Sequence, residues 1–213
     1  MSDAVFERLY QSDQRPPWDL DGPTPFVVDL ESHGQFRGQI LDAGCGTGEN
    51  ALYLATRGHQ VVGMDAAPTA IARATHKARE RGLHSVRFLQ ADACEIPGYD
   101  EAFDTVLDCG FLHVLSAEDQ ARYVRALGRA TRPGATLHLM CFSDRNPPRT
   151  EQRPVGCFTH GVSQSDIRAA FGNQWQLVSV VPTHSTLSLP GRDAREVEFL
   201  QARLLRTNQL VAG

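Results

Sequence analysis

Short apolar segments alternate with longer amphipathic ones from residue 39 onward. The apolar runs are suited to strands, which we expect at 39–43, 61–65, 86–92, 103–109 and 135–142, the last after an Arg-Pro-Gly turn. Between them the apolar residues recur with the period of a helix, over about 48–58, 68–81 and 116–132. Gly58 and Gly82 are expected to end two of these helices, and Ser116 to cap the third. The alternation predicts an α/β fold in which helices cover both faces of a mostly parallel sheet.

The last third of the chain breaks this alternation. A polar, proline-rich stretch follows residue 143, a short helix is expected near 164–171, and two β-like segments span 175–187 and 195–205. The two segments are suited to an antiparallel pair at the sheet edge, although the second fits a helix as well as a strand. The whole pattern predicts a doubly wound, seven-stranded sheet with an antiparallel edge strand.

The 213 residues are most simply one domain with three parts. Residues 1–38 are expected to form an N-terminal arm or lid, 39–142 a ligand-binding core, and 143–213 a substrate-side and edge-strand region.

Charge and composition narrow the class of ligand. A net charge of −4 and a pI near 6.0 give no basic footprint, so neither nucleic acid nor a membrane surface is expected as a partner. There is no apolar run of the roughly 20 residues that span a membrane, and the N-terminus MSDAVFERLY lacks an apolar signal-peptide region. We therefore expect a cytoplasmic protein. The five cysteines are scattered and form no CxxC pair, which favours reduced thiols and predicts no metal site.

The segment LDAGCGTGEN, residues 41–50, carries the most specific pattern. Gly44, Gly46 and Gly48 follow the first strand and open a helix, so main-chain N–H groups can face a ligand. The spacing is GxGxG, not the GxGxxG of dinucleotide binders, and Asp42 precedes it. Because two unit charges about 4 Å apart interact by about 4 kcal/mol at an effective dielectric of 20, this carboxylate opposes a pyrophosphate and favours an ammonium or sulfonium. S-adenosylmethionine carries both cations; a tight turn with a solvated Asp42 is the structural alternative.

Two further acids end the next strands. Asp65 ends the second, where a carboxylate can accept hydrogen bonds from both ribose hydroxyls, although a dinucleotide binder would also place an acid there. Asp92 and Ala93 follow the third, where a carboxylate beside a backbone N–H suits the amino group and N1 of adenine. Alternatively, Asp92 caps its own loop.

These segments resemble the ordered signature of class I S-adenosylmethionine-dependent methyltransferases. LDAGCGTGEN, VVGMD, QADA, FDTVLDCGFLH and ATRPGATLHLMCF lie within roughly residues 39–142. The resemblance implies a Rossmann-like fold, S-adenosylmethionine as cofactor and S-adenosylhomocysteine as product. It assigns Asp42 and Gly44 to the methionine end, Asp65 to the ribose, and Asp92 with Ala93 to the adenine. The other expected cofactor contacts are Trp18, Cys45, Gly46, Gly48, Ala66 and Cys109.

The segment RPPWDLDGPTPF, residues 15–26, can fold as a lid over the carboxyl ends of the strands, where open α/β sheets bind ligands. It resembles the N-terminal segment of small-molecule methyltransferases that act on thiopurines, thiols and halides, through Trp18, Gly22, Thr24 and Phe26. PPWD, together with CFSD after the fifth strand, resembles bacterial methyltransferases that inactivate hydroxylated heteroaromatic toxins. The face of Trp18 suits a sulfonium or a flat heterocycle, unless the residue only pins the arm to the core.

We therefore expect methyl transfer to a hydroxyl, nitrogen or thiol of a small lipophilic heteroaromatic of quinolinol type, with a detoxifying role. A hydroxyl acceptor benefits from a base, and His113, just past the fourth strand, is the catalytic candidate, with Tyr10, Asp144 and His160 as rivals. The expected substrate contacts are Tyr10, Trp18, Phe111, Phe142 and Asp144.

The sequence is also compatible with other functions. They are a thiol, halide or thiopurine S-methyltransferase, an NAD(P)-dependent reductase on a similar sheet, and a catalytically inactive cofactor-binding protein. The sequence leaves the oligomeric state, monomer or homodimer, undecided.

Overall fold

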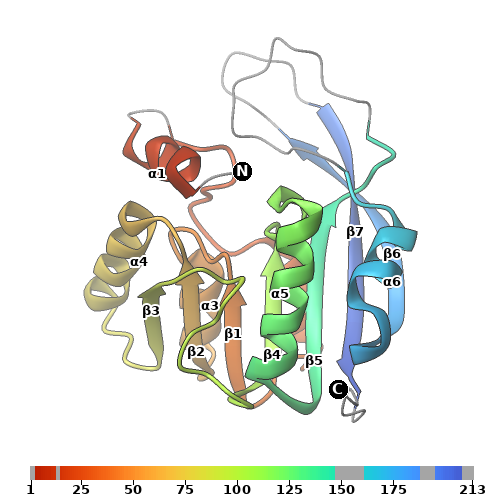
Figure 1. The fold of residues 1–213 in the computed structure, drawn as a ribbon. Coiled ribbons are helices and arrows are strands. Elements are labelled where there is room, and N and C mark those ends of the chain that lie inside the picture. Colours follow the sequence, from red (N-terminus) through yellow and green to blue (C-terminus); the bar gives the residue numbers. More distant parts are fainter. Residues whose placement is uncertain (1–2, 13–14, 147–160, 188–194, 208–213) are drawn as a thin grey trace.

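A computed structural model describes residues 3–12, 15–146, 161–187 and 195–207, which form a seven-stranded sheet with helices on both faces (Figure 1). The strand order is β3-β2-β1-β4-β5-β7-β6. Strands β1 to β5 run parallel, and β7 is antiparallel to both of its neighbours. The predicted doubly wound α/β fold is confirmed, with the antiparallel strand next to the edge strand β6.

The strands are β1 (Gln39–Ala43), β2 (Gln60–Asp65), β3 (Val86–Gln90), β4 (Phe103–Cys109), β5 (Thr131–Phe142), β6 (Trp175–Leu187) and β7 (Arg195–Arg206). The helices are α1 (Asp3–Gln11), α2 (Pro25–Ser32), α3 (Glu49–Thr56), α4 (Pro68–Glu80), α5 (Ala117–Ala130) and α6 (Gln164–Phe171). The ambiguous last segment is a strand. Two details of the sequence prediction were wrong: β3 ends at Gln90, and the Arg-Pro-Gly segment lies within β5, beside a register shift in β4.

The first strand, β1, lies at the topological switch point of the sheet, where the strand order reverses. β1 pairs with β2 on one side and with β4 on the other. The helix after β1, α3, packs on one face, whereas α5, which follows β4, packs on the opposite face. Loops that leave β1 and β4 therefore diverge at their carboxyl ends, which is where open α/β sheets form a ligand crevice.

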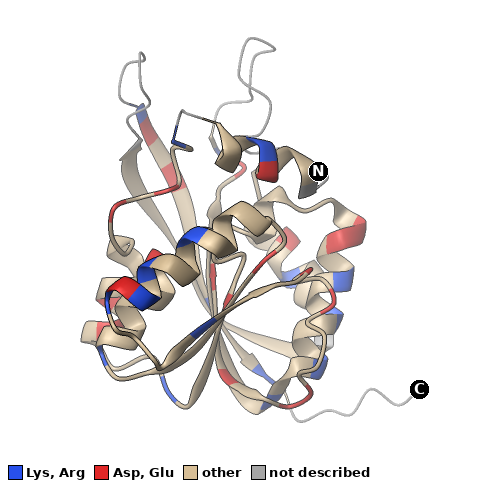
Figure 2. Cartoon of the chain, turned by 90° about the vertical axis from the view of Figure 1, so that its left-hand side faces the viewer, with Lys and Arg blue, Asp and Glu red and all other residues tan. Residues whose placement is uncertain are grey.

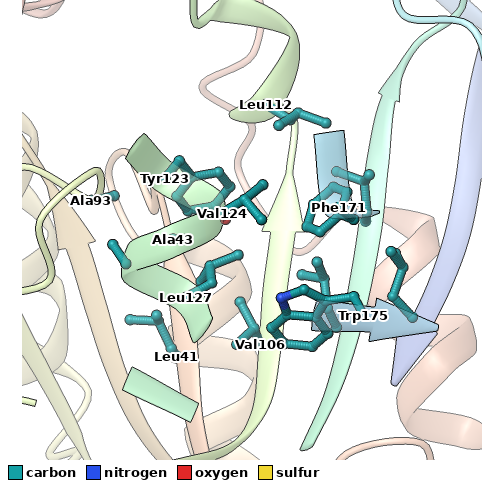
Figure 3. Packing of buried hydrophobic residues seen from close by; sticks show 14 of the residues in the cluster. Leu41, Ala43, Ala93, Val106, Leu112, Tyr123, Val124, Leu127, Phe171 and Trp175 are labelled. Carbon is teal, nitrogen blue, oxygen red and sulfur yellow. The ribbon is translucent and has the colours of Figure 1, made fainter. Parts of the chain in front are cut away.

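Two hydrophobic clusters hold the layers together. On one face Tyr123, Val124 and Leu127 of α5 cover the central strands, beside Phe171 and Trp175 (Figure 3). Ser116 caps α5 as predicted, since its side chain accepts a hydrogen bond from the Asp119 backbone. On the other face apolar residues of α2, α3 and α4 pack against the sheet. Each large buried side chain contributes about 1.5–3 kcal/mol, so these clusters fix the strand ends that carry the site.

The N-terminal arm contains two helices that the sequence prediction missed. α2 begins with Pro25 in its first turn after Thr24, and buries Phe26 and Val27 against the core. α1 packs on α4. Figure 1 shows α1 on the side toward which the parallel strands point their carboxyl ends.

Charges of both signs are interspersed over the helices seen in Figure 2. Within the ranges described, no helix is long and apolar enough to cross a membrane, and no three metal-ligating side chains come together. Cys45, Cys94, Cys109 and Cys141 are free thiols, while Cys157 lies outside the described residues.

Candidate active site

The glycine loop between β1 and α3 is held in a left-handed backbone. The φ angles are 68° at Gly44, 53° at Gly46 and 85° at Gly48. A Cβ at Gly44 would lie 2.6 Å from a ring carbon of Phe111, and one at Gly46 would lie 2.8 Å from the Tyr10 hydroxyl. These glycines therefore permit both the turn and the close approach of two aromatic side chains.

Asp65 connects the loop to the end of β2. One carboxylate oxygen accepts a hydrogen bond from the Gly46 backbone at 2.9 Å, and the other accepts one from the Ala67 backbone at 2.9 Å. Each carboxylate oxygen has more than one acceptor position, so Asp65 can still accept from ribose hydroxyls. Ala66 lies between Asp65 and the first turn of α4, beside the predicted ribose position.

Asp42, at the end of β1, is 1% exposed, and its Oδ2 atom accepts no hydrogen bond from any residue within the described ranges. Burial, and to a smaller extent the charges of Asp108 and Asp65, raise the pKa of Asp42 to about 7, while a backbone hydrogen bond from Ala51 opposes the shift. The buried Oδ2 atom of Asp42 can therefore still accept one hydrogen bond or pair with a cation. This excludes the solvated-carboxylate alternative.

The predicted adenine end has a different arrangement. Asp92 accepts a hydrogen bond from the Cys94 backbone at 2.8 Å and lies 3.3 Å from the Arg122 guanidinium. Asp92 thus caps its own loop, which was the structural alternative, while Ala93 is buried in the core cluster beneath α5. An adenine contact to Asp92 remains a prediction.

Cys109 and Cys45 flank the predicted methionine position. The Cys109 Sγ lies 3.5 Å from the Thr24 hydroxyl, and the Cys45 thiol donates to the Gly46 carbonyl at 3.6 Å. Burial raises the pKa of both thiols, to about 12 for Cys109, so both are neutral near pH 7. They act as small apolar side chains next to the loop.

The arm is tied to the glycine loop and α4 by polar contacts. Asp19 accepts a hydrogen bond from the Thr47 hydroxyl, and Asn50 accepts from the Thr24 backbone at 2.9 Å. Glu7 of α1 accepts a hydrogen bond from the hydroxyl of Thr69 in α4. The loop that would hold the cofactor is thus partly covered by the arm.

Trp18 belongs to an aromatic cluster within the arm. Its indole N–H donates to the Tyr10 hydroxyl at 3.0 Å, and its ring meets Phe6 edge-on with centroids 5.9 Å apart. The contacts of Trp18 in this structure are therefore those of a residue that pins the arm in place, which was the structural alternative. Tyr10 is 3% exposed and its hydroxyl lies against the loop at Gly46, where it feels the charge of Asp65, the predicted ribose ligand.

Trp18→Ala is expected to destabilise the protein by about 2 kcal/mol and to weaken cofactor binding about tenfold, because Tyr10 loses its support over Gly46. Trp18→Phe keeps a ring in the cluster and loses one hydrogen bond, so about 1 kcal/mol is expected. Urea unfolding and calorimetric titration measure both quantities. Unchanged stability in Trp18→Ala with a large loss of affinity would instead mean that the indole stacks on the ligand.

The predicted acceptor residues of the core lie at or just past the ends of β4 and β5. His113 is 2% exposed in a 3-10 turn (Leu112–Val114), and its Nδ1 accepts a hydrogen bond from the Phe142 backbone at 3.4 Å. Its ring meets the Phe142 ring edge-on at 4.9 Å. Phe111 instead packs on Gly44 and Tyr123, and Asp144 is exposed, so neither joins this pair. His160 lies outside the described residues.

Several residues of the site were missed at the sequence level. Asp108 is fully buried beside the end of β1, and Thr47 and Asn50 join the arm to the loop. Phe199 of β7 lies 4.5 Å from Phe142 between ring centroids. Thr47 and Asn50 were visible within the GTGEN motif, but Asp108 and Phe199 come together with the site only through strand pairing.

The charges of this site suit S-adenosylmethionine. The charges of Asp108 and Asp65, at the ends of β4 and β2, help to raise the pKa of Asp42 at the end of β1. A diphosphate would add negative charge there, whereas an ammonium or sulfonium supplies what the unpartnered Asp42 Oδ2 lacks. The fold and the site together define an open α/β protein that binds a positively charged nucleoside, as methyltransferases of this architecture do.

Comparison with known proteins agrees with this class. Residues 40–134 match the family model described as "Methyltransferase domain". The chain is 37% identical over 184 residues to the 2-heptyl-1-hydroxyquinolin-4(1H)-one methyltransferase of Mycobacteroides abscessus, covering 84% of this chain and 79% of that protein. The chain therefore belongs to the S-adenosylmethionine-dependent methyltransferases. It is an enzyme of that family with this cofactor, so the reductase and inactive-protein alternatives have no support.

Two solved structures are similar to this fold. One, described as "Conversion of a Disulfide Bond into a Thioacetal Group during Echinomycin Biosynthesis", has a TM-score of 0.86 at 35% identity and covers 99% of this chain and 94% of its own. The other is the 1,6-didemethyltoxoflavin-N1-methyltransferase of Burkholderia thailandensis with bound 1,6-didemethyltoxoflavin and S-adenosylhomocysteine. Its TM-score is 0.70 at 23% identity, with 97% of this chain and 87% of that chain covered, which shows the fold alone.

Proposed function

We propose that the protein transfers a methyl group to a hydroxyl, nitrogen or thiol of a small lipophilic heteroaromatic compound of quinolinol type. The similarity to the hydroxyquinolinone methyltransferase carries this proposal, because its 184 aligned residues, 84% of the chain, extend well beyond the predicted cofactor core at 39–142. Inactivation of a toxic heterocycle in the cytoplasm is the proposed role. Neither nucleic acid nor a membrane surface is a proposed partner.

An aromatic wall supports a flat, apolar acceptor. Phe142 of β5 and Phe199 of β7 are cross-strand partners, and their ring planes are tilted by 35°. The His113 ring lies against the same Phe142. Offset aromatic pairs contribute about 0.5–1.5 kcal/mol beyond their buried area, so a heteroaromatic ring can extend this stack.

The protein's own residues would hold and orient the two reactants. Asp42 would face the cationic methionine end and Asp65 the ribose, while the arm residues Tyr10 and Trp18 would cover the loop. When bound, S-adenosylmethionine supplies a methyl group on a sulfonium whose bond electrons remain on sulfur. The arm excludes water and the aromatic wall aligns the acceptor atom, and orientation of this kind can supply about 7–11 kcal/mol of a reaction barrier.

A hydroxyl acceptor must also lose its proton, and His113 is our proposed base. In this structure its Nδ1 accepts the Phe142 N–H at a long 3.4 Å, so Nε2 carries the ring proton and the imidazole must release that weak bond before Nδ1 can take a proton. Hydrogen bonds of catalytic groups are often long before the substrate binds.

His113→Gln is expected to lower kcat about 100-fold for a hydroxyl acceptor and to abolish the acid limb of the pH–rate profile. With a thiol acceptor, whose proton is lost far more easily, the loss should be less than about tenfold. Rates measured from pH 5 to pH 9 with both acceptors test this. An equal loss for both acceptors, with the profile unchanged, would make His113 a positioning residue.

A thiol acceptor is the second candidate. The structure associated with conversion of a disulfide into a thioacetal is 35% identical to this chain over nearly its whole length, which favours it over halide or thiopurine acceptors. Transfer of labelled methyl to a panel of hydroxyquinolones, phenols, aromatic amines and thiols, with the product identified by mass spectrometry, distinguishes the two. The proposal requires the hydroxyquinolone to have the highest kcat/KM; a preference for thiols by tenfold or more would replace it.

A further inference from the structure

The strands β6 and β7 extend as a pair beyond the end of their neighbour β5. The pairing of β5 with β7 ends where Phe142 lies opposite Phe199, whereas β6 and β7 stay paired as far as Arg195. With a rise of about 3.3 Å per residue, this extension is about 13 Å long. Figure 1 shows it on the side toward which the parallel strands point their carboxyl ends. We refer to residues 183–187 and 195–199 as the ribbon.

The base of the ribbon is fixed by Asn146. Its side-chain amide accepts a hydrogen bond from the Glu198 N–H at 2.8 Å and donates one to the Glu198 carbonyl at 2.7 Å. The amide thus pairs with β7 in place of a further residue of β5. The Ser143 hydroxyl also donates to the Glu198 carboxylate at 2.6 Å. Because an isolated pair of strands is only marginally stable, these contacts help to keep the ribbon in a defined position.

One face of the ribbon is charged. Side chains alternate between the two faces of a strand, so Glu196 and Glu198 lie on the same face. The cross-strand partner of Glu198 is His184, whose Nε2 atom lies 3.5 Å from the Glu198 carboxylate. An apolar ligand on this face would remove charged groups from water, so we do not expect one there.

The opposite face of the ribbon is uncharged over most of its length. Val197 lies on this face, two residues from Phe199. Their cross-strand partners are Ser185 and Thr183. Val197 and Thr183 are half-buried, and the first charged side chain on this face is that of Arg195, which is exposed at the end of the ribbon. The face therefore offers an uncharged strip about 7 Å long, from Phe199 to Val197.

This strip continues the aromatic wall of the proposed acceptor site. The centroid of the Phe199 ring lies 4.5 Å from that of Phe142. The centroid of the Phe142 ring in turn lies 4.9 Å from that of His113, the proposed base. The path from the proposed base to the ribbon thus runs over two phenylalanine rings. A substituent on an acceptor ring that stacks on this wall would next meet Val197.

The size of the strip suits part of a small ligand, not a protein. A stable protein–protein interface buries about 800 Å² on each partner. A strip that is two strands wide, with strands about 4.8 Å apart, and about 7 Å long covers less than about 100 Å². One short apolar substituent fills such an area.

We propose that the ribbon binds an apolar chain carried by the acceptor, and that Val197 is a specificity-determining residue that contacts this chain. The acceptor class is thereby narrowed to heteroaromatic compounds with a short alkyl substituent. A fully buried methylene favours binding by about fourfold, so a chain buried on one side only should gain about twofold per methylene. The gain should end where the chain reaches Arg195. This inference rests on the proposed function, since it requires the acceptor ring to stack on Phe142.

A series of hydroxyquinolones that carry a methyl, propyl, pentyl or heptyl chain tests this with the full-length protein. We expect the KM of the acceptor to fall about fourfold from methyl to propyl and again from propyl to pentyl, and less than about twofold from pentyl to heptyl. The kcat should stay within about twofold, because the chain contributes equally to the ground state and the transition state. Calorimetric titration of the same compounds, with S-adenosylhomocysteine present, measures binding without turnover.

Two variants with the same substitution locate the chain. Val197→Asp puts a charge on the strip, so the ratio of the KM values of the pentyl and methyl compounds should rise about tenfold. Val181→Asp is the matched control, because Val181 is 53% exposed on the same face of the sheet but lies outside the ribbon. It should leave that ratio unchanged. Val197→Thr keeps the shape of the side chain and should raise the ratio about threefold, which tests the inference even if Val197→Asp fails to fold.

The contrary results can be told apart. A KM that is the same for all chain lengths, or an equal rise of the ratio in the variants of Val197 and Val181, would overturn the inference and leave the proposed methyl transfer intact. Absence of methyl transfer to every hydroxyquinolone would overturn the proposed function. The calorimetric series then tests the ribbon by itself: affinity that rises with chain length would support the inference, and affinity independent of chain length would overturn it.

Discussion

The Asp42→Asn variant is expected to be more stable than the wild-type protein at pH 8 and to bind S-adenosylmethionine about 100-fold more weakly. Because the pKa of Asp42 rises from 3.8 to about 7 on folding, its contribution to stability is fully present below pH 3.8 and is lost as the pH rises through 7. The variant escapes that loss, which corresponds to about 2–4 kcal/mol.

Urea unfolding at pH 4 and pH 8 measures the first effect, and calorimetry the second. The two proteins should differ by less than about 1 kcal/mol at pH 4, where the buried carboxyl group is protonated. Asp29→Asn, at an exposed position on α2, should change neither quantity. A variant that is less stable at both pH values, with normal cofactor affinity, would show that Asp42 is a structural acceptor only.

The Gly44→Ala variant is expected to lose cofactor binding by 100-fold or more, because the new Cβ would lie 2.6 Å from the Phe111 ring and must displace it or the loop. The left-handed backbone adds about 1–2 kcal/mol of strain. Gly82→Ala is the matched control, since Gly82 has a φ of 63° and open space around its Cβ position. The Gly82→Ala variant should lose stability through the same backbone strain but should keep its affinity for the cofactor.

Unfolding and titration of the two glycine variants distinguish strain from displacement. Should both variants bind the cofactor like the wild-type protein, the glycine loop would not be the cofactor cradle. A comparable loss of affinity in both would point to global destabilisation instead.

The core strands could be predicted from the sequence because each is a continuous apolar run between turn residues. The bounds of β1 and β4 agree with the structure for this reason. The last strand was ambiguous, since REVEFLQARLL has apolar residues at both helical and strand spacing. Its pairing with β5 and β6 along nearly its full length resolves the ambiguity, and such pairing has no local signal.

The arm illustrates the opposite limit. Thr24 followed by Pro25 was a visible start signal for α2, whereas α1 is short and its Phe6 and Tyr10 gain a role only by docking on Trp18 and α4. Single helices of that length are marginal in water, so tertiary packing decides whether they form.

The residues of the site could be predicted where they lie within one motif, but not where strand pairing brings them together. Asp42 precedes the glycines in the same motif, so the glycine pattern also indicates a role for this acid. Asp108 is distant in sequence, and only the β1–β4 pairing places it next to Ala43. Its burial could not be deduced from the motif, because a carboxylate that ends a strand is more often solvated.

We expect the choice of cofactor to depend on one electrostatic property, a pocket with buried negative charge at the end of β1. Titration of the apo protein at pH 8 with S-adenosylmethionine and, separately, with NAD tests it most directly. We expect saturable binding of S-adenosylmethionine that weakens as the pH falls below 7, and no detectable heat with NAD. Tight binding of the diphosphate compound, or S-adenosylmethionine affinity that rises at acid pH, would contradict it.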